Sequence, residues 1–170
     1  MHWADFAAQK LSERGETQVV VSGITPSGEF HIGHLREILS AEMIHRACLD
    51  FGLESRYVFI VDSMDPLRRV YDFLSPSYES YIGVPLANIP APGEDGEPDP
   101  EGGSYAEFFL RPFLEALKQI GVEPEVIMNH ETYQNGEFAE MIDLAITNRD
   151  EIHGIIESVS GRELPEDWFP

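Results

Sequence analysis

The feature that most constrains the fold is an apolar segment, a glycine-rich turn and a helical pattern, followed by a second apolar segment. The β-branched run Val19-Val20-Val21 predicts a strand over about 18–22, and the helical pattern covers about 33–50. Residues 56–61, Arg-Tyr-Val-Phe-Ile-Val, predict a second strand that is buried on both faces, as in parallel sheets. Two strands joined through a helix predict a parallel βαβ unit with a right-handed crossover.

The turn between the first strand and the helix, Gly23–His34, carries groups suited to phosphate. It offers the hydroxyls of Thr25 and Ser27, and the side chains of His31 and His34 lie on one face of the first helical turn. Free backbone N–H groups and the helix dipole favour an anion there. The alternative interpretation is a helix-capping turn with two incidental histidines.

A second polar segment, Asp62–Val70, follows the second strand. In open α/β sheets ligands bind outside the carboxyl ends of the strands, where both segments lie. Asp62 could hold an ammonium group or a ribose hydroxyl. Asp65 could cap a helix whose first turn carries Pro66, or contact a ligand. Arg68 and Arg69 could pair with phosphate or with nearby acids.

Composition narrows the class of protein. The chain has 170 residues, enough for one domain with a core, and no apolar run long enough to span a membrane. Its start lacks a signal-peptide pattern, which predicts a cytoplasmic location. The only cysteine is Cys48, so an internal disulfide is excluded.

With 31 acidic and 11 basic residues the formal charge is −20, which opposes nucleic-acid binding by the whole surface. Adaptation to high salt and simple solubility both explain such a charge.

The rest of the chain completes an α/β pattern. Residues 84–103 are rich in Pro, Gly and Glu and predict a long loop that is either mobile or a lid. A helix is predicted over 104–120 with Ser104 as its N-cap, then a strand at 126–128, then helical segments over about 132–159. We therefore expect residues 1–170 to form a single Rossmann-like nucleotide-binding domain, a parallel sheet with flanking helices on both sides.

The sequence His31-Ile32-Gly33-His34 resembles the nucleotide-binding signature of class I aminoacyl-tRNA synthetases, and the likeness to class I lysyl-tRNA synthetases extends over the whole chain. The further matching segments are His2–Asp5, Ser22–His34, Val61-Asp62, Asp65–Arg68, Ser104–Glu107 and Asn148–Asp150. The resemblance implies that ATP and lysine form lysyl-adenylate and pyrophosphate, and that the lysyl group then passes to tRNA(Lys).

The resemblance also assigns residues. It implies catalytic roles for His31 and His34, which would contact the ATP phosphates. It implies an ATP site made of Thr25, Ser27, His31, Gly33 and His34. It implies a lysine site made of Gly23, Thr25 and Asp62. Mg²⁺ is expected with ATP, and no metal-binding residue is assigned in this chain.

Three parts of the family pattern are absent: the second signature loop of the Lys-Met-Ser-Lys-Ser type, the cysteine-rich insertion and the anticodon-reading helical domain. The chain therefore resembles the first half of the catalytic domain, with weak or no aminoacylation expected alone. An incomplete sheet would leave an edge uncovered, which predicts self-association or another partner. The alternatives are a free-standing module that binds ATP or an adenylate, and a pantetheine-phosphate or nicotinamide-mononucleotide adenylyltransferase.

Overall fold

The computed structural model describes residues 2–170, and contacts between Cα atoms divide the chain into two compact units. The first unit is Met1–His130 and the second is Glu131–Pro170. The expectation of a single domain over residues 1–170 stays a prediction.

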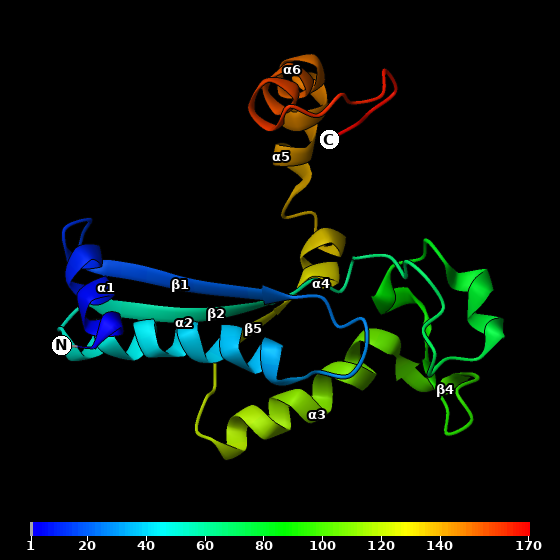
Figure 1. The fold of residues 1–170 in the computed structure, drawn as a ribbon, viewed down its shortest axis with the longest axis horizontal. Helices are drawn as coiled ribbons and strands as arrows, with labels where there is room; N and C mark the ends of the chain where they lie inside the picture. Colours follow the sequence, from blue (N-terminus) through cyan, green and yellow to red (C-terminus); the bar gives the residue numbers. More distant parts are fainter. Residues whose placement is uncertain (1) are drawn as a thin grey trace. The chain divides into compact units, whose positions relative to one another are not determined.

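A three-stranded parallel sheet organises the first unit (Figure 1). Its order is β1 (Thr17–Ile24), β2 (Glu54–Val61) and β5 (Glu125–Met128), with β2 in the centre. The helix α2 (Ile32–Asp50) connects β1 to β2, and the two strands pair in register from Thr17↔Glu54 to Ile24↔Val61. The predicted α/β class and the predicted βαβ unit are confirmed.

One face of this sheet carries the main core. Because side chains alternate along a strand, Ile24, Phe59 and Val61 point to the same side, where α2 and α3 (Tyr105–Gln119) supply their apolar residues. The helix residues of this cluster are Ile38, Ala41, Leu110, Phe113 and Leu117. Both large helices of the first unit therefore cover the same face, so helices on both sides are not found within this unit.

The opposite face of β1 is open. Val19 and Val21 point away from α2 and are 56% and 51% exposed. Among the described residues β1 pairs with β2 alone, so its other edge has no neighbouring strand. The expected uncovered edge is present at β1, and what covers it stays a prediction.

The first helix, α1 (Trp3–Ser12), packs on α2 rather than on the sheet. Small side chains allow this close approach: Ala4 and Ala8 meet Ala47 and Cys48 in a second buried cluster. The free thiol of Cys48 is fully buried there, which suits a small core residue.

The segment predicted as a long loop, 84–103, holds regular structure. It contains the short 3-10 helix η2 (Leu86–Asn88) and the antiparallel strands β3 (Pro90–Pro92) and β4 (Pro98–Ser104). With the 3-10 helix η1 (Pro76–Tyr81) and the start of α3 it surrounds a third cluster, in which Tyr78 and Tyr105 are fully buried. Order here comes from packing across the sequence, which a Pro/Gly-rich composition does not reveal.

The helix expected after Asp65 is absent. Instead Pro66 forms an isolated bridge with Pro85, and the backbone of Leu67 exchanges hydrogen bonds with Gly83 and Val84. Asp65 consequently caps no helix.

The second unit is helical. The helix α4 (Asn129–Gln134) begins at the boundary between the units, and α5 (Ala139–Thr147) and α6 (Arg149–Ser160) follow. Gly161 ends α6 with a left-handed φ of 66°, a conformation that glycine adopts without strain. No helix within residues 2–170 combines the length and the apolar character needed to cross a membrane.

Candidate functional site

The histidines at the start of α2 build their own helix cap. His31 is the N-cap residue, and its Nδ1 accepts a hydrogen bond from the backbone N–H of Gly33 at 3.0 Å. In return the backbone N–H of His31 donates to Nδ1 of His34, also at 3.0 Å. This reciprocal arrangement is a capping box with imidazoles in place of the usual hydroxyl and carboxylate. The turn therefore does cap the helix, as the alternative interpretation expected. The two histidines are not incidental, because their own side chains form the cap.

The cap fixes which nitrogen of each ring can donate. Because both Nδ1 atoms accept backbone N–H groups, the neutral rings carry their protons on Nε2. Burial lowers the pKa of His34, the nearby His31 lowers it further, and Glu37 partly opposes the shift. The ring centroids lie 3.9 Å apart. The helix start thus presents two adjacent imidazoles whose Nε2–H groups remain available to an anion.

Glycine at position 33 is required by this geometry. A Cβ there would lie 2.7 Å from Cε1 and 2.9 Å from Nδ1 of His31. A side chain at position 33 would therefore displace the His31 ring and break the cap.

Thr25, at the end of β1, is tied to the segment after β2. Its Oγ1 donates to Oδ2 of Asp65 at 2.7 Å, and Nη2 of Arg68 lies 3.4 Å from the same oxygen. A hydroxyl has one proton, so Thr25 can only accept a hydrogen bond from any further partner. This polarity suits a ligand that carries N–H groups.

Two polar pairs join the ends of β2 and β5. Asn129 donates to Oδ1 of Asp62 at 3.3 Å, while the buried hydroxyl of Ser63 lies 2.8 Å from Nδ1 of His130 and accepts its backbone N–H at 3.0 Å. Burial raises the pKa of Asp62, and Asp65 raises it further against the opposing hydrogen bond from Asn129. An ionised Asp62 in these surroundings would be stabilised by a cationic ligand.

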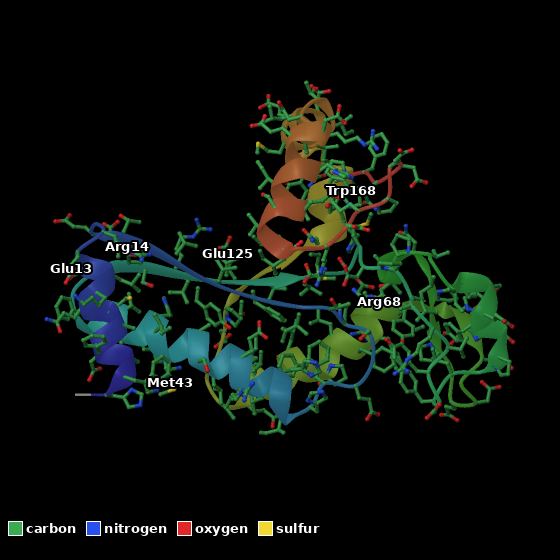
Figure 2. All side chains as sticks on the ribbon, turned by 45° about the horizontal axis from the view of Figure 1, so that its top comes forward. Glu13, Arg14, Met43, Arg68, Glu125 and Trp168 are labelled. Atoms are coloured by element: carbon green, nitrogen blue, oxygen red, sulfur yellow. The ribbon has the colours of Figure 1, made fainter. Side chains whose placement is uncertain are left out.

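A cleft of about 540 Å³ opens over the turn Gly23–His34, which is called the signature turn below. The turn, the segment after β2, the tip of the β3–β4 hairpin and α3 all contribute to it. Its lining residues are Thr25, Ser27, Gly28, Glu29, His31, His34, Tyr71, Phe73, Pro92, Gly93, Glu94, Gly96, Phe108 and Phe109. In Figure 2 Arg68 lies beyond the carboxyl ends of the strands, the edge where the predicted ligand site belongs.

The hairpin tip is held against this cleft by close backbone contact. Gly96 has φ of 78°, and a Cβ there would lie 2.9 Å from the carbonyl oxygen of Phe73. The N–H of Ser75 donates to the Gly96 carbonyl at 2.9 Å, and its hydroxyl donates to Glu97 at 2.6 Å. This hydrogen bond lowers the pKa of Glu97. The segment predicted as a loop or lid is therefore a fixed wall of the cleft in this structure.

Comparison with known proteins identifies the family. The family model described as tRNA synthetases class I (K) matches residues 1–170. The chain belongs to this class I tRNA synthetase family. It is 46% identical to a lysine–tRNA ligase of Archaeoglobus fulgidus, and 44% identical to lysine–tRNA ligases of Methanosarcina acetivorans and Methanocaldococcus jannaschii. Each match covers the whole chain but only 31–33% of the relative, so the chain spans about a third of their length.

Within this class I synthetase chain, the structure brings some of the predicted site residues to the cleft and not others. Thr25, Ser27, His31 and His34 line it. Gly33 does not line the cleft, but its lack of a side chain leaves space for the His31 ring. Gly23 and Asp62 lie beside each other, with a Cβ at Gly23 3.7 Å from Oδ2 of Asp62, outside the lining of the cleft.

Several residues that shape the site were missed by the sequence analysis. Asn129 and His130 directly follow the third strand, so the rule that singled out Asp62 would have found them too. Glu37 accepts the backbone N–H of Gly23 at 3.2 Å, and Tyr105 donates to the Ser27 carbonyl at 2.8 Å. These two contacts join residues that are 14 and 78 positions apart in the sequence, so no local pattern predicts them.

Proposed function

We propose that this chain binds ATP and lysine and supplies the histidine-bearing half of a lysine–tRNA ligase active site. The observation that carries the proposal is the reciprocal His31–His34 cap, which directs two Nε2–H donors at the N-terminus of α2 beside the cleft. The family membership and the lysine–tRNA ligase relatives support the same activity.

The ATP phosphates would lie at the start of α2. Neutral imidazole N–H groups donate to phosphate oxygens, the hydroxyl of Ser27 adds a donor, and the helix dipole favours the anion. Mg²⁺ enters as part of the nucleotide substrate, with the phosphates supplying its oxygen ligands. Gly33 acts indirectly, because it leaves space for His31.

Lysine would lie toward the ends of β1 and β2. The Thr25 hydroxyl already donates its hydrogen bond to Asp65, so its oxygen can accept from an ammonium group but cannot donate to a phosphate. Asp62 would add an acceptor and an anionic charge on the same side, and Gly23 leaves space beside it, since a Cβ there would lie 3.7 Å from Oδ2 of Asp62. Of the two sites expected to use Thr25, the hydrogen-bond polarity favours the lysine site.

The reaction follows from this placement. A carboxylate oxygen of lysine attacks the α-phosphorus of ATP, the bond to the bridging oxygen of the β-phosphate breaks, and pyrophosphate leaves with its electron pair. His31 and His34 hold the phosphates and stabilise the charge that develops on them, so their contribution is positioning and electrostatic stabilisation. Transfer to tRNA(Lys) in the cytoplasm completes the proposed activity of the whole enzyme.

A module that binds ATP or an adenylate without aminoacylation is the second candidate. The observation that favours it is the formal charge of −20, which repels an RNA backbone.

Calorimetry with ATP, lysine and a non-hydrolysable lysyl-adenylate analogue tests the proposal. We expect the analogue to bind more tightly than ATP, and norleucine, which lacks the ε-ammonium group, not to replace lysine. His31→Asn keeps an N-cap acceptor but loses the Nε2–H, so it should weaken ATP binding without unfolding α2. His45→Asn, on the same helix and bonded to Ser55, is the matched control.

Lysine-dependent exchange of pyrophosphate into ATP separates the two candidates. Weak exchange by the chain alone is the expected result. Tight analogue binding with no detectable exchange would favour the binding module, and absence of any lysine dependence would contradict the ligase assignment.

A further inference from the structure

A buried tyrosine holds the signature turn from the protein interior. Tyr105, the first residue of α3, is fully buried, and its hydroxyl donates to the carbonyl oxygen of Ser27 at 2.8 Å. Burial raises the pKa of Tyr105, and Tyr71 and Tyr78 raise it further, so the hydroxyl keeps its proton and remains a donor. The proposed reaction assigns no role to this hydrogen bond.

The position of the Tyr105 hydroxyl is set by contacts outside the signature turn. The backbone N–H of Tyr105 donates to the carbonyl of Ile89 at 2.9 Å, in the segment before β3. Its ring packs against the rings of Phe109 and Tyr78, with centroids 4.7 Å and 6.1 Å away. Three segments therefore fix the ring, and the turn must adapt to it.

The part of the turn that Tyr105 contacts has no regular structure. The N–H of Ser27 donates to the carbonyl of Thr25 at 2.9 Å, whereas the N–H of Gly28 has no hydrogen-bond partner among residues 2–170. Ser27 and Gly28 both line the cleft, and Tyr105 does not. Tyr105 thus holds the peptide group between Ser27 and Gly28 by its carbonyl side.

The planarity of the peptide group connects this hydrogen bond to the cleft. In a planar trans peptide the N–H points opposite to the C=O, and the peptide between Ser27 and Gly28 is trans. Because the Ser27 carbonyl is directed at the buried Tyr105, the N–H of Gly28 is directed away from that ring. A rotated peptide would instead turn the negative end of its carbonyl toward the cleft, where it would repel an anion.

We propose that Tyr105 is a positioning residue for the ATP phosphates. Its hydroxyl keeps the Ser27 carbonyl in the interior, so that the unpaired N–H of Gly28 faces the cleft as a further donor to the anion. The inference rests on the proposed function and adds to it a residue outside the cleft. Tyr105 contacts no substrate and acts through the peptide group alone.

Tyr105→Phe tests the proposal, because it removes the hydroxyl and keeps the buried ring. Tyr78→Phe is the matched control: Tyr78 is also fully buried, contacts the Tyr105 ring, and donates to the carbonyl of Pro90 at 2.9 Å, outside the signature turn. Since each variant loses one buried hydrogen bond, the urea midpoints of the two should fall by similar amounts. A shared loss of stability then cannot explain a difference in ligand binding.

The ligands are ATP and inorganic tripolyphosphate, each titrated into the 170-residue chain by calorimetry. We expect Tyr105→Phe to weaken both about three- to tenfold, the contribution of one ordinary hydrogen bond. Tyr78→Phe should leave both affinities nearly unchanged. Equal weakening by the two variants would overturn the proposal, because it would trace the effect to the loss of a buried hydroxyl in general.

Amide exchange of Gly28, followed by NMR, gives a second readout that needs no variant. ATP should slow the exchange of this N–H in the wild-type chain, and the protection should be smaller in Tyr105→Phe. An unprotected Gly28 amide at saturating ATP would overturn the proposal even if Tyr105→Phe did not fold.

The failure of this inference differs from the failure of the proposed function. Wild-type affinity of Tyr105→Phe for ATP would remove the positioning role and leave the proposed function standing. Absence of ATP binding to the wild-type chain would overturn both.

Discussion

The carboxyl edge of the sheet and the outward face of β1 differ sharply. At the carboxyl edge several polar side chains have partners: His31 and His34 cap α2, Thr25 bonds Asp65, and Ser63 bonds His130. On the outward face of β1 Val21 is half exposed, and among the described residues the outer edge of this strand has no partner.

This difference separates the site from the domain that carries it. The groups proposed to hold ATP and lysine are arranged by contacts within the first unit alone. The exposed face of β1 is apolar, and the exposure of apolar surface to water does not stabilise the sheet. The proposed site is thus arranged before any ligand binds, on a sheet whose outer face at β1 is exposed.

The largest expected effect comes from making the same valine-to-threonine substitution once on the helix-covered face of the sheet and once on the outer face of β1. Val61→Thr places a hydroxyl without a partner in the helix-covered core, where Val61 is fully buried, and should cost about 1–3 kcal/mol of unfolding free energy. Val21→Thr should change it by less than about 0.5 kcal/mol. Urea unfolding of both variants measures the contrast. Equal losses would mean that the outer face of β1 is covered in solution.

The next effect concerns the polarity of the Thr25 hydroxyl. Thr25→Val removes an acceptor for an ammonium group and should weaken lysine binding about tenfold or more, since a hydrogen bond to a charged group contributes about 1.5–3 kcal/mol. ATP affinity should stay unchanged, and Thr25→Ser should retain lysine binding. Calorimetry with each ligand measures this. A loss for ATP instead would show that Thr25 serves the phosphates.

Self-association through the open edge of β1 is a smaller effect. We expect light scattering to show an apparent mass that rises with concentration, because an unpaired edge beside exposed valines can pair with another chain. Val21→Lys should suppress the rise by placing charge on that face, while Val126→Lys on β5 tests the other edge strand. A monomer at all concentrations would contradict the prediction.

The smallest expected effect is the pH dependence contributed by His34. Its pKa is lowered in the folded chain from the usual 6.5, so the folded state binds fewer protons than the unfolded state just below that pH. The stabilisation is complete above about pH 6.5 and is lost as the pH falls through the folded pKa. Urea midpoints of wild type and His34→Gln, compared from about pH 8 to about pH 5, should converge. A constant difference would contradict this.

The sequence predicted the elements whose signals are local. The valine run, the turn and the apolar segment at 56–61 predicted the βαβ unit, and the end of the second apolar segment placed Asp62 at the carboxyl end of its strand. Ser104 begins α3 as expected from its spacing to Glu107.

What could not be predicted depends on contacts between distant segments. The bridge from Pro66 to Pro85 replaces the helix expected after Asp65, and the contact of Gly96 with the Phe73 carbonyl holds the hairpin that composition described as a loop. The hydrogen bond that Thr25 donates to Asp65 likewise cannot be read from the sequence. The ends of helices and strands, and which side chains donate or accept hydrogen bonds, could be determined only from the three-dimensional arrangement.

The imidazole cap means that the first turn of α2 and the proposed chemistry depend on the same two rings, with Nδ1 of each ring capping the helix and Nε2 left for the ligand. Replacing either histidine by alanine would both fray the helix and remove a proposed phosphate donor, so an inactive alanine variant would not reveal which of the two losses mattered. Conversely, an anion that tightens the two rings should slow amide exchange along the start of the helix, which would make the backbone itself a reporter of occupancy.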